Sequence, residues 1–182
     1  MRISKFILSA FILSAMSSTA FADDKAFHAG AVITEFGKVA TIDSDMKIPR
    51  RAKFKVLFDT ATGADAGQVN RTLNSAARFL NMHEEAGVSE AHMKIAVVFH
   101  GKGSFDLTTS SFYSGKFDGA ENGNKELIKA LTNKGVRIIL CGQTAAYYNI
   151  TKDDLLPGVE MALSAMTAHA LLQQDGYTLN PF

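Results

Sequence analysis

The chain has 182 residues, with 19 Lys and Arg against 18 Asp and Glu, and a single cysteine. This near-neutral balance gives no electrostatic basis for binding nucleic acid or an anionic membrane surface. One cysteine also excludes an intramolecular disulfide, so side-chain packing has to stabilise the fold.

The first 22 residues have the pattern of a cleavable secretory signal. Arg2 and Lys5 precede an apolar run over residues 6–15, and an A-x-A cleavage site ends at Ala22. The alternative is a membrane anchor, but the apolar run covers only about ten residues where a spanning helix needs roughly 20. We therefore expect a signal peptide over 1–22 and a periplasmic mature protein. The leader holds no acid, so its removal changes the formal net charge from +1 to −1.

Residues 23–52 are expected to form an extended N-terminal arm. Two short β-like pieces, Ala31–Ile33 and Val39–Ile42, stand on either side of Gly37 and suggest a loose hairpin. The pattern leaves open whether this arm lies on its own domain or on a neighbouring subunit.

From Lys53 onward, strand-like and helix-like segments alternate. Apolar runs rich in β-formers predict strands over 54–58, 94–99, 136–140, 159–164 and 177–179. Apolar residues at intervals of three and four predict helices over 68–86 and 125–133, a short helix ending near 148, and a last one over 166–174. The segment 104–121, rich in Ser, Thr, Gly and Phe, is expected to be a long loop with room for a short helix. Strict alternation predicts right-handed crossovers and a parallel sheet between helical layers.

Three of the predicted strands are followed by residues that carry chemistry. Asp59 follows the first strand, His100 the second and Cys141 the third. Ligands of open parallel sheets gather at the carboxyl ends of the strands, and parallel strands open on one edge. We therefore expect Cys141 and His100 to lie one or two strand spacings apart, roughly 5 to 10 Å.

Cys141 stands where a strand gives way to a helix, and unsatisfied N–H groups at a helix start favour negative charge. A thiol there should ionise more easily, and the thiolate is the nucleophile and the sulfur carrier. His100 can accept or return a proton near neutral pH. We expect Cys141 and His100 to be the catalytic residues. Gly101, Gly142 and Gln143 are expected to bind the ligand.

Structural roles for these residues are the alternative. A free cysteine is among the most buried residue types, so Cys141 can equally be inert filler or a link between chains. His100 alone can be a structural histidine, and His169 is expected to be packed or solvated within the last helix. No histidine has a zinc-ligand spacing with Cys141, so no metal is expected. Gly63 and Gly67 lack the third glycine of a dinucleotide fingerprint, and no P-loop or nucleophile elbow is present, so no cofactor is expected.

Several segments of the chain resemble the DsrE/DsrF-like family, most closely its secreted branch. They cover residues 54–59, 70–81, 95–101, 135–144, 156–159 and 173–177. The strand ending in His-Gly and the later Cys-Gly stand in the family's order. The resemblance extends from Lys53 to Phe182, and the arm also looks like the one that precedes the domain in the secreted branch.

This resemblance implies a three-layer α/β/α fold of DsrE/YchN type, with a mostly parallel sheet of about five strands. It also implies assembly as homotrimers, homohexamers or mixed hexamers. In the family's sulfur-relay members a cysteine after a central strand carries persulfide sulfur, and Cys141 matches that position, followed by the acidic turn Asp153-Asp154. Those relay members act in the cytoplasm, whereas this chain has a leader.

Two functions are therefore expected of a DsrE-like α/β domain over 53–182. The first is periplasmic sulfur handling, in which the protein is a sulfur carrier or sulfurtransferase and Cys141 holds the transferred sulfur. The second is a non-catalytic oligomeric module that binds a small ligand or a protein in the strand-end cleft and the 104–121 loop. The expected partners are other copies of the chain and a sulfur donor or acceptor protein, with no nucleic acid and, after signal cleavage, no membrane.

Overall fold

The computed structural model of this protein describes residues 26–181. The predicted signal peptide therefore lies outside the described residues. The domain is built on one five-stranded sheet in which every paired strand is parallel, as predicted. The strands are β1 (Phe54–Thr60), β2 (Met93–Phe99), β3 (Arg137–Cys141), β4 (Val159–Ala162) and β5 (Thr178–Asn180), in the order β4-β3-β2-β1-β5.

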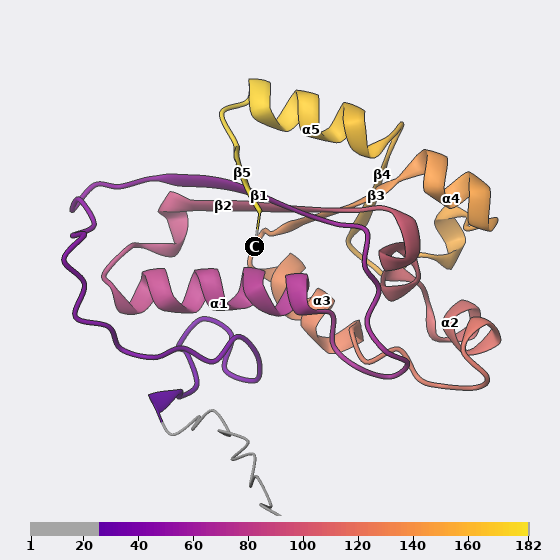
Figure 1. The fold of residues 1–182 in the computed structure, drawn as a ribbon, viewed down its shortest axis with the longest axis horizontal. Helices are drawn as coiled ribbons and strands as arrows, with labels where there is room; N and C mark the ends of the chain where they lie inside the picture. The colour runs from indigo at the N-terminus through magenta and orange to yellow at the C-terminus, as the bar shows by residue number, and fades with distance from the viewer. Residues whose placement is uncertain (1–25, 182) are drawn as a thin grey trace, which may run out of the picture.

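Helices lie on both faces of the sheet, which gives the three layers that were expected (Figure 1). On one face are α1 (Arg71–Glu85) and α3 (Lys125–Asn133), and on the other is α5 (Ala165–Gln174). The shorter helices are α2 (Ser110–Lys116), α4 (Gly142–Tyr148), and the 3-10 turns η2 (Glu90–His92), η3 (Gly101–Leu107) and η4 (Lys152–Asp154). Within residues 26–181, no helix is both long and apolar enough to cross a membrane.

The strands and helices predicted after Lys53 are present, with two informative differences, whereas the β-like pieces predicted in the arm form no strand, and His28 and Val39 make only one antiparallel bridge there. β4 ends at Ala162, before the predicted residue 164, because the side chain of Ser164 caps α5 by accepting the Thr167 N–H at 3.0 Å. The segment 104–121 contains the short helix for which room was expected, α2, but η3 precedes it and Gly103 to Leu107 are buried, so less of the segment is loop than predicted.

Each face of the sheet has its own core because strand side chains alternate between faces. On the α1/α3 face, Phe58, Phe99 and Leu140 belong to a large apolar cluster that also includes residues of both helices. On the α5 face, a smaller cluster lies beneath a single helix. Its buried members are Leu57, Ala96, Val98, Ile139, Ala168, Leu172 and Tyr177.

The arm lies on its own domain, along the outer side of α1 (indigo in Figure 1). The fully buried side chain of Asn81 in α1 binds it, accepting the N–H groups of Val32 and Ile33 at 3.2 and 2.9 Å. The same side-chain amide donates to three carbonyl oxygens of the arm, those of Ile33, Phe36 and Gly37, at 2.9 to 3.0 Å. One polar side chain therefore satisfies a turn of backbone that would otherwise be buried without partners.

Candidate functional site

The alternation along the strands carries three polar side chains onto the α5 face. Asp59, His100 and Cys141 each stand two residues beyond a buried residue of that face, so all three point toward it. Those preceding residues are Leu57, Val98 and Ile139. The three residues therefore lie together at the carboxyl edge of the sheet, as expected.

The register of β2 and β3 sets the level of His100 relative to Cys141. Phe99 pairs with Leu140, so the next residue of each strand path stands at the same level on neighbouring strands. The separation is thus one strand spacing, the shorter of the two that were expected.

A pocket of about 460 Å³ lies at this end of the sheet, against the first turns of α5. Its lining residues are Asp59, His100, Cys141, Gln143, Thr144, Ser164, Ala165, Met166 and His169. The chain leaves β3 into α4, whose Ala145 packs in the large core, and leaves β4 into α5 on the opposite face. The pocket therefore opens where consecutive connections diverge, which is the usual ligand position in such sheets.

Cys141 is the N-cap residue of α4 and is 6% exposed. Burial by itself raises the pKa of its thiol, but hydrogen bonds from the Thr144 hydroxyl and from backbone N–H groups lower the pKa by more. Those N–H groups belong to Thr144, Ala165 and Gln143, so both α4 and the start of α5 contribute donors. The net pKa is below the ordinary value of a thiol, which favours the nucleophilic thiolate.

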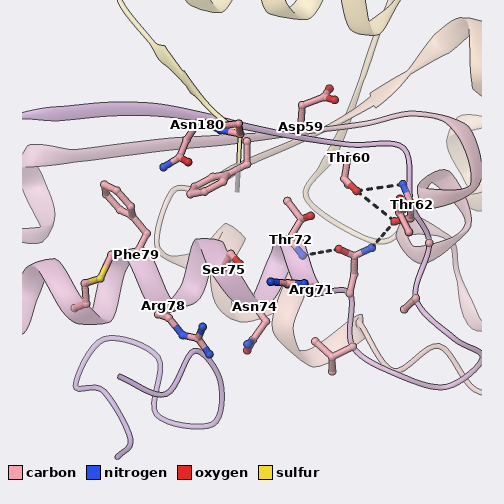
Figure 2. A pocket seen from close by; sticks show the side chains of 17 residues that line it. Asp59, Thr60, Thr62, Arg71, Thr72, Asn74, Ser75, Arg78, Phe79 and Asn180 are labelled. Carbon is pink, nitrogen blue, oxygen red and sulfur yellow. Dashed lines mark hydrogen bonds between the residues drawn. The ribbon is translucent and has the colours of Figure 1, made fainter. Parts of the chain in front are cut away.

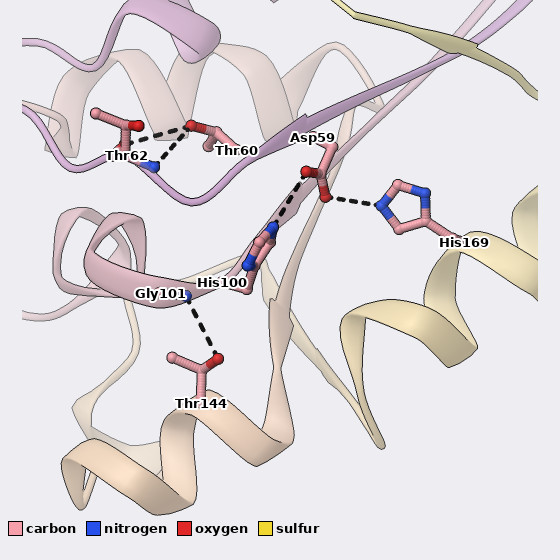
Figure 3. Close-up of polar contacts among 7 residues, drawn as sticks. All are labelled: Asp59, Thr60, Thr62, His100, Gly101, Thr144 and His169. Atoms are coloured by element: carbon pink, nitrogen blue, oxygen red, sulfur yellow. Dashed lines mark hydrogen bonds and ion pairs between the residues drawn. The ribbon is translucent and has the colours of Figure 1, made fainter.

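Thr144 links this sulfur to the end of β2. Its Oγ1 accepts the Gly101 N–H at 3.4 Å (Figure 3). The hydroxyl proton of Thr144 is therefore available for the hydrogen bond to Cys141. Gly101, expected to bind the ligand directly, thus bonds Thr144 and does not line the pocket. Gly101 therefore acts on Cys141 only through Thr144.

The two other residues expected to bind ligand have different surroundings. Gln143 lines the pocket, and its side-chain amide donates to the Leu163 carbonyl at 3.2 Å. Gly142 does not line the pocket, because its Cα faces the Ala162 carbonyl so closely that any Cβ would overlap it. Glycine at 142 therefore serves the close approach of β4 to α4.

Asp59 joins two histidines that come from different elements. One carboxylate oxygen lies 3.1 Å from Nε2 of His100, and the other lies 2.7 Å from Nε2 of His169 in α5 (Figure 3). His169 was expected only to be packed or solvated, so sequence reasoning missed its place in the site. The missing information is the rotation of α5 against the sheet, which no local pattern in that helix specifies.

A buried carboxylate positions the loop that follows β1. Asp106 in η3 accepts the Ala64 N–H at 2.9 Å and the Asn70 side-chain amide at 2.7 Å. Burial raises the pKa of Asp106, and these two hydrogen bonds act against that rise. The segment 104–121 therefore supports the edge of the site from below, and none of its residues lines the pocket that contains Cys141.

A larger pocket, of about 940 Å³, lies on the opposite side of β1, between α1 and the end of β5 (Figure 2). It is lined by Arg71, Arg78 and Asn180 among others, and Asp59 is its one residue in common with the smaller pocket. We take the smaller pocket as the candidate site because it alone brings the thiol and both histidines together. Within residues 26–181, no group of three or more His, Cys, Asp or Glu is arranged to hold a metal ion.

These features define an α/β domain with a thiol and a histidine at the carboxyl edge of a parallel sheet. The chain belongs to the DsrE/DsrF-like family, whose model matches residues 53–181. The arm precedes the matched segment.

Two solved structures are similar to this one. A protein of unknown function from Methanobacterium thermoautotrophicum, MTH1491, is 24% identical, with 71% of this chain and 100% of that chain covered and a TM-score of 0.50. The ychN protein from E. coli is 15% identical, with 71% and 99% covered and a TM-score of 0.51. At these identities the likeness shows the fold alone. No curated protein sequence matches the chain.

Proposed function

We propose that this protein handles sulfane sulfur in the periplasm, with Cys141 as the atom that accepts and releases it. The observation that carries the proposal is the setting of Cys141. It lies in a pocket with a histidine, and hydrogen-bond donors hold its pKa below the ordinary value. Membership of the DsrE/DsrF-like family supports the same chemistry.

The accepting step needs no oxidant when the donor is a hydropersulfide, R–S–SH. The Cys141 thiolate attacks the terminal sulfur, a new S–S bond forms, and the S–S bond of the donor breaks with its electron pair leaving on R–S⁻. The proton from Cys141 passes to His100 and then to the leaving thiolate. The products are the Cys141 hydropersulfide and R–SH, and the same step with an acceptor thiol releases the sulfur.

Mass spectrometry tests the accepting step. Reduced, purified protein incubated with glutathione hydropersulfide should gain about 32 Da, located on Cys141 by peptide mapping. Cys141→Ser is the control and should gain nothing. Adding excess thiol should remove the added mass. Absence of the adduct on wild-type protein with hydropersulfide, polysulfide and thiosulfate alike would rule out a sulfur-carrier role.

Export and partners belong to the same proposal. The signal pattern over residues 1–22 supports a periplasmic location, and N-terminal sequencing of the mature protein from a periplasmic extract should begin at Asp23. An intact Met1 in a cytoplasmic fraction would contradict it. A protein or small thiol that exchanges sulfur with Cys141 is the expected functional partner.

Self-association, which the family resemblance implies, has one support in the fold. Three large apolar side chains on the α5 layer face solvent: Leu163, Met166 and Leu171 are 73%, 79% and 61% exposed. Exposed apolar residues that gather on one layer favour a contact surface for another copy of the chain. Analytical ultracentrifugation should show a trimer or hexamer that Leu171→Glu weakens. Met46→Glu, at an exposed position of the arm, is the matched control.

A non-catalytic binding module is the second candidate, and the low exposure of Cys141 favours it. A sealed thiol would not react with sulfur donors, whereas the pocket beside it would still accept a small ligand. Alkylation of the native protein separates the two functions. If iodoacetamide reaches Cys141 only after unfolding, the binding module is favoured.

A further inference from the structure

The carboxylate of Asp59 is shared by two imidazoles, and each is bonded through the same ring atom. Nε2 of His100 meets Oδ2 at 3.1 Å, and Nε2 of His169 meets Oδ1 at 2.7 Å. All three side chains line the pocket of Cys141. They come from the end of β1, the end of β2 and from α5, so the fold brings together groups that are far apart in the sequence.

The inventory of donors decides the protonation pattern. An ionised carboxylate only accepts hydrogen bonds, so each imidazole has to donate from Nε2. A neutral imidazole carries one N–H, so Nδ1 of each ring is then a free acceptor. In His100 that acceptor lies on the side of the ring away from Asp59 (Figure 3). The hydrogen bond to Asp59 thus fixes the N–H of His100 on Nε2 and leaves Nδ1 as a base with a defined direction.

We propose that Asp59 is the positioning residue of this site. It holds both histidines in the Nε2–H tautomer and leaves Nδ1 of His100 to take the proton of Cys141, an inference that rests on the proposed sulfur-carrier function. His169 positions Asp59 in turn. By occupying Oδ1 it stops the carboxylate from rotating and leaves Oδ2 in line with His100.

The exposures of the three side chains agree with this order of roles. His169 is 20% exposed, Asp59 is 32% and His100 is 36%. The most enclosed member is the one farthest along the relay from the thiol, where a fixed anchor is needed. The most open member is the one that has to exchange a proton with a substrate.

Replacing Asp59 with Asn gives a sharp prediction because the amide keeps the shape and changes the donors. The Asn oxygen can accept from one imidazole, but its NH₂ group can only donate to the other. One of the two histidines therefore has to switch to the Nδ1–H tautomer. Long-range ¹H–¹⁵N NMR of the ring nitrogens, at a pH where both imidazoles are neutral, reads this directly.

The full experiment combines that spectrum with single-turnover sulfur uptake from glutathione hydropersulfide. In wild-type protein both His100 and His169 should show Nε2–H. Asp59→Asn should switch one of them. If His100 switches, uptake should slow about 100-fold at saturating donor, with little change in the donor concentration at half-maximal rate, and if His169 switches, uptake should stay near that of wild type. Asp59→Glu should restore the tautomers and part of the rate. His92→Gln, outside the site, is the control for histidine substitution.

His169→Gln tests the second part. Here the glutamine amide can still donate to Asp59, so this variant should keep an uptake rate near that of wild type, whereas His169→Leu removes the donor and should lower the rate about tenfold, with the fold of both checked by circular dichroism. An Nδ1–H tautomer for His100 in wild-type protein, or unchanged tautomers in Asp59→Asn, would overturn the positioning role even if sulfur loads normally. Wild-type protein that shows both Nε2–H tautomers but takes up no sulfur would retain the positioning role of Asp59 and overturn the sulfur chemistry.

Discussion

The two faces of the sheet differ in how deeply they are covered. On one face, α1 and α3 pack over a cluster of 24 buried residues, and the arm lies over α1 as a further layer. On the other face, α5 alone covers a cluster of seven. The thinly covered face is the one that presents Asp59, His100 and Cys141. The deeply covered face supplies stability, which lets the other leave polar strand ends accessible to a ligand.

The largest expected effect compares one substitution on both faces. Leu140 and Leu57 are each fully buried, the first in the large cluster and the second beneath α5. We expect Leu140→Ala to lower the free energy of unfolding by about 4 kcal/mol and Leu57→Ala by about 3 kcal/mol, because a single helix can shift to fill part of the cavity. Urea denaturation measures both. An equal or larger loss for Leu57→Ala would show that the α5 face is packed as rigidly as the other.

The next largest effect concerns how much the contact between the arm and α1 stabilises the fold. Asn81→Ala leaves two N–H groups and three carbonyl groups of the arm without their partner, and we expect a loss of about 3 kcal/mol. Asn74→Ala removes only the bond to the Gly37 N–H and should cost about 1 kcal/mol. Thermal unfolding of the two variants gives the comparison. Similar losses would mean that the arm adds nothing beyond one hydrogen bond.

A smaller effect concerns reactivity at the thinly covered face. Thr144→Val removes the hydroxyl that lowers the pKa of Cys141, so the pKa should rise and alkylation by iodoacetamide at pH 7 should slow. Thr144→Ser keeps the hydroxyl and should stay near wild type. The alkylation rate as a function of pH gives the pKa of each variant. Identical curves for Thr144→Val and wild type would exclude this hydroxyl as a cause.

The smallest effect is expected at an ion pair on the same face. Arg137 donates two hydrogen bonds to Glu160, at 2.9 and 2.7 Å, and both side chains are 46% exposed. Hydrogen bonding to Arg137 lowers the pKa of Glu160, so the pair stabilises the fold above the ordinary glutamate pKa and this contribution is lost as pH falls through the lowered value. Because of solvent screening, Glu160→Gln should cost about 0.5 kcal/mol at pH 7. Urea denaturation at acidic pH should show no difference, and a difference that persists there would argue against the ion pair.

Much of this architecture follows from local patterns in the sequence. The continuous apolar runs identify the strands, and the residues that end three of them, Asp59, His100 and Cys141, were placed on one edge because parallel strands share it. Side-chain alternation then puts all three on one face. These inferences need only the periods of strands and helices.

What the sequence could not supply depends on contacts between distant segments. The rotation of α5 brings His169 to Asp59, and the crossing of η3 beneath the β1 loop buries Asp106. The composition of 104–121 suggested a long loop, yet part of the segment is buried, and Asn122 donates to the Asp106 and Thr108 carbonyls and so satisfies backbone that a buried segment cannot leave unpaired. Polar side chains there form buried hydrogen bonds with the backbone, which composition alone does not reveal.

Asn81 shows how a residue inside a family domain can depend on a segment outside it. Within the matched residues 53–181 an amide in the middle of an amphipathic helix looks like a solvent-facing position, whereas here it is fully enclosed by residues 32–37. Shortening the chain at its N-terminus would thus uncover a hydrogen-bonding group evolved for an interior. Transplanting the domain without residues 32–37 should therefore be accompanied by a redesign of position 81.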